Sequence, residues 1–284
     1  MNIGLVLSGG MAKGAYQIGA LRAISNFIPR EEMKYISCAS IGVLNGYAYA
    51  TDHLDRAEDM WKSLCNPDTR LLVTQLLRSS ILQQNIKNIH DPDRPLSSTF
   101  YCTLFDWSGR NIVYKDLSAV EQESLPLYLK ASVAMPIYNR SVPLDGASYF
   151  DGAMIDNIPV HPLLKHNLDY IFCIYFDDTS YRFENTYFDN KVIKITFPSE
   201  SVLKQSVIFK QNSIEDMIKD GYDRTMYILN MVFAKGIKDL DYIYGAIEYM
   251  NRGTKNNGFR ITGDVLVTNL NRITQKLTKR KISK

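Results

Sequence analysis

The chain contains no apolar run long enough to cross a lipid bilayer. The longest strongly apolar run, residues 170–176, is far shorter than the roughly 20 residues that a membrane-spanning helix needs. The N-terminus carries no basic segment ahead of an apolar core, and its first apolar run ends in glycines, so it does not predict a signal peptide. We therefore expect a cytoplasmic protein without a membrane-spanning helix.

Cysteine is also scarce, and so is charge of one sign. The four cysteines stand far apart without metal-ligand spacing, which favours reduced and mostly buried thiols in an intracellular protein. The net charge of +3 is too small to indicate nucleic acid as a partner. No calcium-binding loop and no His/Cys cluster occurs in the sequence, so we expect neither a metal nor a cofactor. The four thiols are Cys38, Cys65, Cys102 and Cys173.

Apolar residues, at 45% of the 284, are numerous enough to build a substantial core. Residues 3–7 form an apolar run closed by glycines, and helical spacing follows over about 15–27. The same strand-turn-helix unit repeats in residues 35–39 and 43–49. Two such units in succession predict an α/β fold with a mostly parallel central sheet flanked by helices.

Further elements follow from apolar spacing and turn signals. We expect a catalytic domain over 1–234 and a C-terminal extension over 235–284, partly helical and ending in a basic, frayed tail. A long amphipathic helix pair is predicted over 201–231, with a break at Gly221. The other predicted elements are helices in 54–64, 71–89 and 125–134, a hairpin over 99–115, and strands at 169–176 and 192–197.

Ser40 is the first candidate for chemistry. It follows a predicted strand and precedes a helix, so a sharp turn exposes its hydroxyl beside the helix N-terminus. The usual pattern of such an elbow is Gly-x-Ser-x-Gly. Here Gly42 is present and Cys38 takes the place of the first glycine. On this segment alone, a serine that merely caps the helix is the commoner structure.

The glycine-rich segment from Gly9 to Gly14 is the second candidate. Such a loop between a strand and a helix presents free N–H groups that can hold a phosphate or an oxyanion. Gly-Lys-Ser/Thr is missing, so the segment is not a P-loop, and Met11 stands where a dinucleotide fingerprint has glycine. In isolation, a tight turn without a ligand is an equal alternative.

Asp151 is the third candidate, within Asp151-Gly152-Ala153 after a short apolar run. Asp-Gly is a common surface turn, and Asp145-Gly146-Ala147 repeats the tripeptide six residues earlier. The residues alone leave open which of the two aspartates, if either, is functional.

Together, these segments resemble the patatin-like phospholipase family. The family's glycine loop, nucleophile elbow, Ala-Ser-x-Ala-x-Pro segment and Asp-Gly-Gly/Ala motif are similar to residues 8–17, 40–46, 131–136 and 151–153. Asn157-Ile158-Pro159-Val160 follows at the family's distance, which assigns the aspartate role to Asp151 rather than Asp145. The similarity runs from about residue 3 to 178, is loose to about 227, and is absent beyond that.

The resemblance implies a patatin-like three-layer sandwich and a lipid acyl hydrolase with a Ser40–Asp151 dyad. It further implies an oxyanion hole built from the backbone of Gly9, Gly10, Met11, Ala12, Lys13 and Gly14. Substrates would be phospholipids or other lipid esters, compatible with peripheral membrane contact, and no metal is required. Met11 and Cys38 depart from the family's glycines and would restrict φ at both positions.

Two alternatives accompany this interpretation. A Ser-Asp-His triad would use His161 or His166, which follow Asp151 in the chain order of ordinary α/β hydrolases. Alternatively, the chain keeps the patatin fold as a catalytically impaired lipid-binding or regulatory protein, for which Met11 and Cys38 are the hints.

Overall fold

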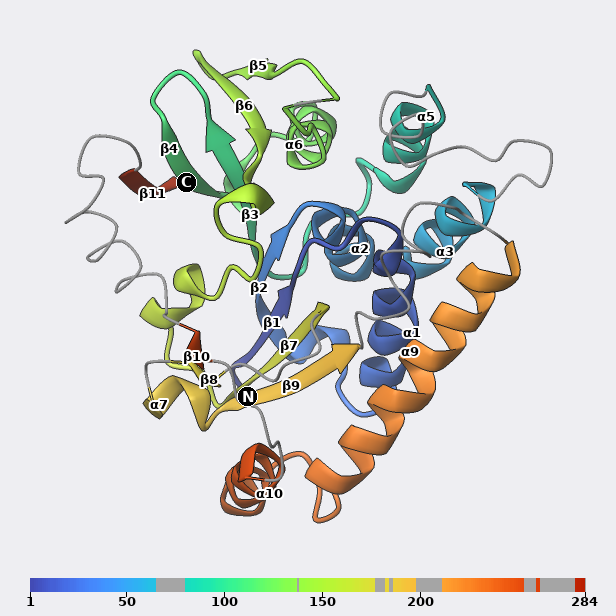
Figure 1. Ribbon diagram of the computed structural model, residues 1–284, viewed down its shortest axis with the longest axis vertical. Helices are drawn as coiled ribbons and strands as arrows, with labels where there is room; N and C mark the ends of the chain where they lie inside the picture. Colours follow the sequence, from blue (N-terminus) through green and yellow to red (C-terminus); the bar gives the residue numbers. More distant parts are fainter. Residues whose placement is uncertain are drawn as a thin grey trace.

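The computed structural model describes residues 1–64, 80–136, 138–176, 182–183, 186–197, 211–252, 259–260 and 279–283 (Figure 1). Cys65 and the first part of the helix predicted over 71–89 lie outside these ranges, as do residues 201–210. The three described cysteines are buried thiols that form no disulfide with one another, as the sequence predicts.

A nine-stranded sheet runs through the described part of the chain, with the order β11-β4-β3-β2-β1-β7-β9 and with β6 and β5 added beside β3. All neighbours from β3 to β9 in this order are parallel, as is β11 with β4. The pairs β3–β4, β3–β6 and β5–β6 are antiparallel. The mostly parallel sheet and the hairpin predicted over 99–115 are thus confirmed. The strands are β1 Ile3–Leu7, β2 Met33–Ala39, β3 Thr99–Asp106, β4 Asn111–Asp116, β5 Val142–Leu144, β6 Ala147–Asp151, β7 Tyr170–Phe176, β9 Val192–Phe197 and β11 Lys279–Ser283, with β8 Arg182–Phe183 and β10 Phe259–Arg260 pairing separately.

Helices cover the sheet and its two ends (Figure 1). The α-helices are α1 Gly14–Ser25, α2 Ile41–Ala50, α3 Leu54–Ser63, α5 Ser80–Ile89, α6 Leu125–Ser132, α7 Thr186–Asp189, α9 Gln211–Val232 and α10 Leu240–Arg252. The short 3-10 helices are η1 Met11–Lys13, η2 Arg30–Glu32, η3 Leu117–Ala119, η4 Gly152–Met154 and η5 His161–Lys165.

Successive side chains of a central strand point to opposite faces of the sheet, so they enter different layers of the fold. In β1, Leu5 and Leu7 join the larger apolar cluster with residues of α1, α2 and α9, whereas Val6 points to the opposite face. There it meets a second cluster that includes Leu163 of η5 and Tyr175 of β7. Both faces of the central strands are therefore buried, and the architecture is the predicted three-layer α/β sandwich.

Two predictions about the C-terminal half are wrong. The helix α9 is unbroken at Gly221, because that glycine serves packing rather than termination: a Cβ there would lie 2.1 Å from the Tyr16 carbonyl oxygen of α1. Residues 279–283, expected in a frayed tail, form strand β11 against β4. The division of the chain at 234/235 stays a prediction.

Candidate active site

The glycine loop and Ser40 emerge side by side at one edge of the sheet. β1 ends at Leu7 and leads into the loop, while β2 ends at Ala39 and leads into Ser40. The two strands are parallel neighbours, with Leu7 paired to Cys38. Both segments therefore lie at the carboxyl ends of adjacent parallel strands, where open α/β sheets bind their ligands.

Ser40 lies on a sharp strand-to-helix turn. Its backbone has a φ of 53° and a ψ of −132°, and residues other than glycine rarely adopt such a positive φ. Helix α2 begins at the next residue. Gly42 allows the turn to pass close to β1, because a Cβ there would lie 2.8 Å from the Leu7 carbonyl oxygen. Strained backbone of this kind clusters at functional sites.

Cys38, which departs from the elbow pattern, is fully buried in β2. Space for its thiol comes from Gly46 in α2, where a Cβ would lie 2.6 Å from Cys38 Sγ. Burial raises the pKa of the Cys38 thiol well above its ordinary value, so the group stays neutral. The departure is thus accommodated by a glycine on the facing helix.

Asp151 is a buried carboxyl at the end of β6, with a side chain that lies beside Ser40. Burial raises its pKa to about 7, and the hydrogen bonds from the Ser40 hydroxyl and the Ala153 N–H oppose this shift in part. The Ala153 N–H donates to Asp151 Oδ1 at 2.9 Å, and the Asp151 N–H donates to the Ala134 carbonyl at 2.9 Å. The second contact ties Asp151 to the Ala-Ser-x-Ala-x-Pro segment. Gly152 is needed for close approach, since a Cβ there would lie 2.8 Å from the Leu104 nitrogen.

Asp145, the near twin of Asp151, occupies a different environment. It lies in the turn between β5 and β6, where its side chain is 58% exposed. Its carboxylate accepts hydrogen bonds from Tyr128 and Lys115, and the Tyr128 bond holds its pKa below the ordinary value. These contacts give Asp145 a structural role in joining α6 and β4 to the turn.

Gly9 places the loop directly against Ser40. A Cβ at Gly9 would lie 2.8 Å from Ser40 Cβ, 3.2 Å from Ala153 Cβ and 2.5 Å from Asn157 Oδ1. Asn157 also exchanges two hydrogen bonds of 3.3 Å with the Gly9 backbone, one in each direction. Asn157, on sequence only a marker of the family, therefore fixes the loop beside the serine.

The remaining loop N–H groups differ in what they can do. The Gly9 N–H donates to Asn157, and the Lys13 N–H donates to the Gly10 carbonyl at 3.1 Å. Within the described ranges, the N–H groups of Gly10 and Met11 donate to no backbone or side-chain acceptor. The Ala12 N–H has no such acceptor either, but Ala12 is buried. Gly10 and Met11 are therefore the two of the six predicted oxyanion-hole residues whose available donors lie at the accessible tip of the loop.

The other loop residues support this tip. Ala12 is buried, and Gly14 begins α1, where a Cβ would lie 2.5 Å from the Trp61 ring. The Lys13 ammonium lies 5.8 Å from the centre of the Phe176 ring at the end of β7. Met11 has a φ of 51°, the left-handed conformation that glycine adopts without strain.

A buried polar network behind the loop was missed by sequence reasoning. Gln17 Nε2 donates to the Ser8 carbonyl at 2.8 Å, and Asn45 Nδ2 donates to Gln17 Oε1 and to the Gly14 carbonyl, both at 2.8 Å. Trp61 Nε1 in turn donates to Asn45 Oδ1 at 3.0 Å. The network joins the glycine loop to the helix that follows Ser40. Its only sequence signal was an amide side chain within each of two apolar helices.

The two histidines of the alternative triad pack elsewhere. The His166 ring stacks on Tyr35 at 3.8 Å between ring centres and makes a 3.0 Å hydrogen bond with the Tyr101 hydroxyl. The His161 ring lies 5.5 Å from the Tyr114 ring. Neither of these contacts involves Ser40 or Asp151.

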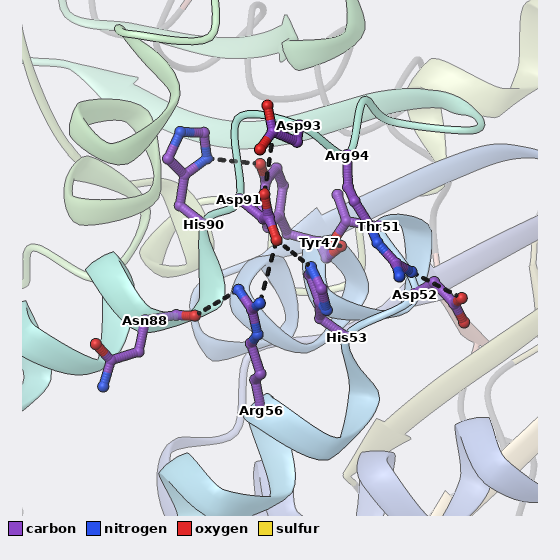
Figure 2. A network of polar contacts seen from close by, with 10 residues as sticks. All are labelled: Tyr47, Thr51, Asp52, His53, Arg56, Asn88, His90, Asp91, Asp93 and Arg94. Atoms are coloured by element: carbon purple, nitrogen blue, oxygen red, sulfur yellow. Dashed lines mark hydrogen bonds and ion pairs between the residues drawn. The ribbon is translucent and has the colours of Figure 1, made fainter.

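The other two histidines belong to a polar network at the end of α2, opposite the end that carries Ser40. Figure 2 shows Asp91 joined to both His53 and Arg56, each at 3.1 Å, and His90 joined to the Tyr47 hydroxyl at 2.8 Å. These contacts connect α2 to α3 and to the loop after α5. Their geometry indicates an anchor for the helix rather than a second reactive centre.

A cavity of about 560 Å³ lies between α5, α6 and β5, next to the Asp151 segment. Ala134, whose carbonyl accepts the Asp151 N–H, forms part of its wall. Lys130 and Arg140 contribute cationic side chains. The apolar lining consists of Leu82, Leu127, Val133, Val142 and Pro143.

Two kinds of feature are absent from the described residues. These residues contain no cluster of three or more His, Cys, Asp or Glu side chains that could hold a metal ion. They also contain no helix that is both long and apolar enough to span a membrane.

Comparison with known proteins identifies the family of the chain. The structure of VipD from Legionella pneumophila is similar, at 11% sequence identity and a TM-score of 0.51, with 81% of this chain and 67% of VipD covered; this likeness concerns the fold. The type III effector protein ExoU gives 15% identity and a TM-score of 0.45, with 89% of this chain and 60% of ExoU covered. Residues 5–164, more than half of the chain, match the family Patatin-like phospholipase. The chain therefore belongs to the patatin-like phospholipase family.

Proposed function

We propose that the protein is a lipid acyl hydrolase that cleaves carboxylic ester bonds of phospholipids or related lipids, with Ser40 as nucleophile and Asp151 as base. One observation carries the proposal: a serine on a strained turn lies beside a buried carboxyl whose pKa is raised to about 7. A general base with a pKa near the working pH is ionised in a large fraction of the molecules and is still basic enough to accept a proton from the serine hydroxyl. Family membership makes lipid esters the substrate class.

In the first half of the reaction, the Ser40 hydroxyl transfers its proton to Asp151 as Oγ bonds to the ester carbonyl carbon. The carbonyl oxygen becomes an oxyanion. The protonated Asp151 then gives the proton to the departing alcohol oxygen, the carbon–oxygen bond breaks, and an acyl group remains on Ser40.

In the second half, a water molecule takes the place of the alcohol. Asp151 accepts a proton from this water as its oxygen attacks the acyl carbon, and the proton returns to Ser40 Oγ as the fatty acid leaves. The carboxylate and the free serine are restored, so the cycle needs no further reactant.

The N–H groups of Gly10 and Met11 are the proposed oxyanion donors. They lie at the tip of the loop that Gly9 presses against Ser40, and they donate to no acceptor within the described chain. Each such donor contributes on the order of 3 kcal/mol to stabilising the transition state. Asn157 and the network of Gln17 and Asn45 hold the loop so that its donors are aligned before substrate arrives.

The cavity between α5, α6 and β5 is the proposed acyl site. Its wall includes Ala134, which accepts the Asp151 N–H, and its apolar lining suits a hydrocarbon chain. Lys130 and Arg140 at the same cavity suit the phosphate of a phospholipid, which favours phospholipid over neutral esters.

Labelling with a fluorophosphonate, followed by hydrolysis assays on a lipid panel, tests the proposal. Wild type should be labelled and Ser40→Ala should not, with the helix-surface variant Ser25→Ala as a matched control. Asp151→Asn keeps an acceptor for the Ala153 N–H but loses the base, so hydrolysis should fall by roughly 10²–10⁴-fold. Asp145→Asn, at the twin aspartate, should retain hydrolysis.

Two outcomes of this experiment would replace the proposal. Near-complete loss of hydrolysis in a folded His161→Ala or His166→Ala variant would favour the triad over the dyad. A folded wild type that reacts neither with the probe nor with any lipid ester would favour the catalytically impaired binding protein.

A further inference from the structure

A second pocket lies along β9, the edge strand next to β7. It has a volume of about 380 Å³ and is formed by β9, α9 and α10. β9 is the last strand of the sheet, and α10 contacts the amino end of β7, where the Tyr244 hydroxyl donates to the Asp169 carbonyl at 2.6 Å. Figure 1 shows α10 at this end of the molecule, away from the carboxyl strand ends that carry Ser40.

Arg224 of α9 brings an uncompensated positive charge into this pocket. Arg224 is exposed overall, and desolvation of its guanidinium lowers its pKa. Among the described residues, the guanidinium donates to Thr196 Oγ1 at 3.5 Å, near the limit for a hydrogen bond. Across the described ranges, no carboxylate lies within ion-pair distance of Arg224. A guanidinium without a counter-ion from the described chain is available to pair with an anionic group of a ligand.

The neighbouring charges are already paired. Lys194, which also lines the pocket, forms a 2.7 Å ion pair with Asp189 and donates to Asn251 at 3.3 Å. On α9, Asp223 pairs with Lys219 at 2.7 Å, and on α10 Glu248 pairs with Arg252. The pocket lining contains no carboxylate, so the excess charge facing its interior is that of Arg224.

The rest of the lining is apolar. Ile228 and Ile247 are 7% and 2% exposed, and they line the pocket together with Met231 and Met250. Tyr227 stands at the same pocket with 67% of its surface exposed. Methionine and isoleucine side chains offer a hydrocarbon chain a flexible apolar surface. One cation beside such a surface matches a ligand with one anionic end and one apolar end.

We infer that this pocket binds a single-chain anionic amphiphile, with the anionic headgroup on Arg224 and Thr196 and the chain along Ile228, Met231, Ile247 and Met250. The planar guanidinium can donate two parallel hydrogen bonds to a carboxylate or a phosphate. The inference does not depend on hydrolysis, since it concerns residues that the proposed reaction does not use.

Calorimetric titration of the full chain carrying Ser40→Ala tests the inference without turnover. The ligands are laurate, dodecyl phosphate, the neutral dodecanol and inorganic phosphate. Laurate or dodecyl phosphate should bind clearly more tightly than dodecanol and inorganic phosphate, and the tighter of the two identifies the headgroup. Adding Arg224→Gln should weaken that ligand by about tenfold to a hundredfold. Lys219→Gln, which removes a cation from the same helix outside the pocket, should leave binding unchanged.

Three outcomes would overturn the inference. Equal binding of dodecanol and laurate would show that no charge is recognised, and equal binding of inorganic and dodecyl phosphate would show that no chain is bound. Unchanged laurate and dodecyl phosphate binding in Arg224→Gln would place the ligand elsewhere, for example in the cavity beside Asp151. The melting temperature provides a fold control: removing an exposed cation without an ion-pair partner among the described residues should leave it unchanged.

Discussion

At the scale of the residue, Met11 and Ser40 both adopt a left-handed backbone conformation at the candidate site. Their φ angles are 51° and 53°. At Ser40, the strained turn exposes the side-chain hydroxyl. Met11 is 37% exposed, and its proposed contribution to the reaction is its backbone N–H, which any residue other than proline supplies. The family's glycine at this position would give the same donor without the strain.

Met11→Gly is therefore expected to stabilise the protein and to retain hydrolysis. A left-handed φ costs a residue with a side chain roughly 1–2 kcal/mol, while glycine adds about 0.5–1 kcal/mol of unfolded-chain entropy, so the net gain is up to about 1.5 kcal/mol. Urea unfolding measures it. Lys13→Gly, at a φ of −62°, is the matched control and should destabilise. Equal free-energy changes in both variants would contradict the strain argument.

The raised pKa of Asp151 predicts the pH dependence of the reaction. The carboxyl must be ionised to accept the Ser40 proton, so kcat/KM for a soluble short-chain ester should rise with pH through an apparent pKa of about 7. Below that pKa it should fall by roughly tenfold per pH unit, since only the ionised fraction reacts. A profile that stays flat down to about pH 5 would mean that Asp151 titrates near the ordinary carboxyl value.

Residue identity was easier to predict than residue environment. Asp151 and Asp145 share the same tripeptide, but their environments differ: Asp151 is 2% exposed, and Asp145 lies in an open turn. The sequence places Ser40 on a turn through the strand-helix pattern around it. It cannot reveal that Asn45 reaches back to Gly14 and Gln17, because these contacts depend on how two helices pack.

At the scale of the element, the crossing of α1 and α9 depends on two glycines. A Cβ at Gly19 would lie 1.8 Å from the Ile218 carbonyl oxygen, and one at Gly221 would lie 2.1 Å from that of Tyr16. Both obstacles are backbone atoms, which cannot move aside as a flexible side chain would. The crossing therefore brings the two helix backbones into direct contact.

Gly19→Ala should destabilise the protein although alanine favours a helix. Overpacking typically lowers the free energy of unfolding by about 1–3 kcal/mol. We expect a loss of about 3 kcal/mol here, because the added methyl group meets backbone atoms that cannot move aside. The matched control is Gly245→Ala in α10, where a Cβ meets open space, and it should stabilise by about 1 kcal/mol. Thermal unfolding of both variants provides the comparison. Similar melting temperatures would show that α1 and α9 separate at little cost.

Elements with strong local patterns were predictable, and those fixed by distant partners were not. The apolar runs of β1, β2, β7 and β9 identify buried parallel strands directly. The sequence around Gly221 suggests a helix break. It carries no sign that this glycine allows α9 to pack closely on α1. The basic residues of β11 carry no strand pattern, and their conformation comes from pairing with β4.

At the scale of the whole molecule, every group that the proposed reaction uses comes from the chain itself. The nucleophile, the base and the oxyanion donors lie on three segments that converge at one edge of the sheet. Hydrolysis is therefore expected to continue unchanged in EDTA, measured against an untreated sample. Loss of activity in EDTA that returns with added calcium would contradict a metal-independent mechanism.

Strand β11 has a consequence for how the protein is made. Residues 279–283 leave the ribosome after every other described strand, yet they cover the outer edge of β4. Until they are translated, that edge presents unpaired N–H and C=O groups to whatever strand comes near. Neighbouring nascent chains on one messenger RNA carry the same open edge, so chains whose synthesis stops before residue 279 are the species most prone to associate.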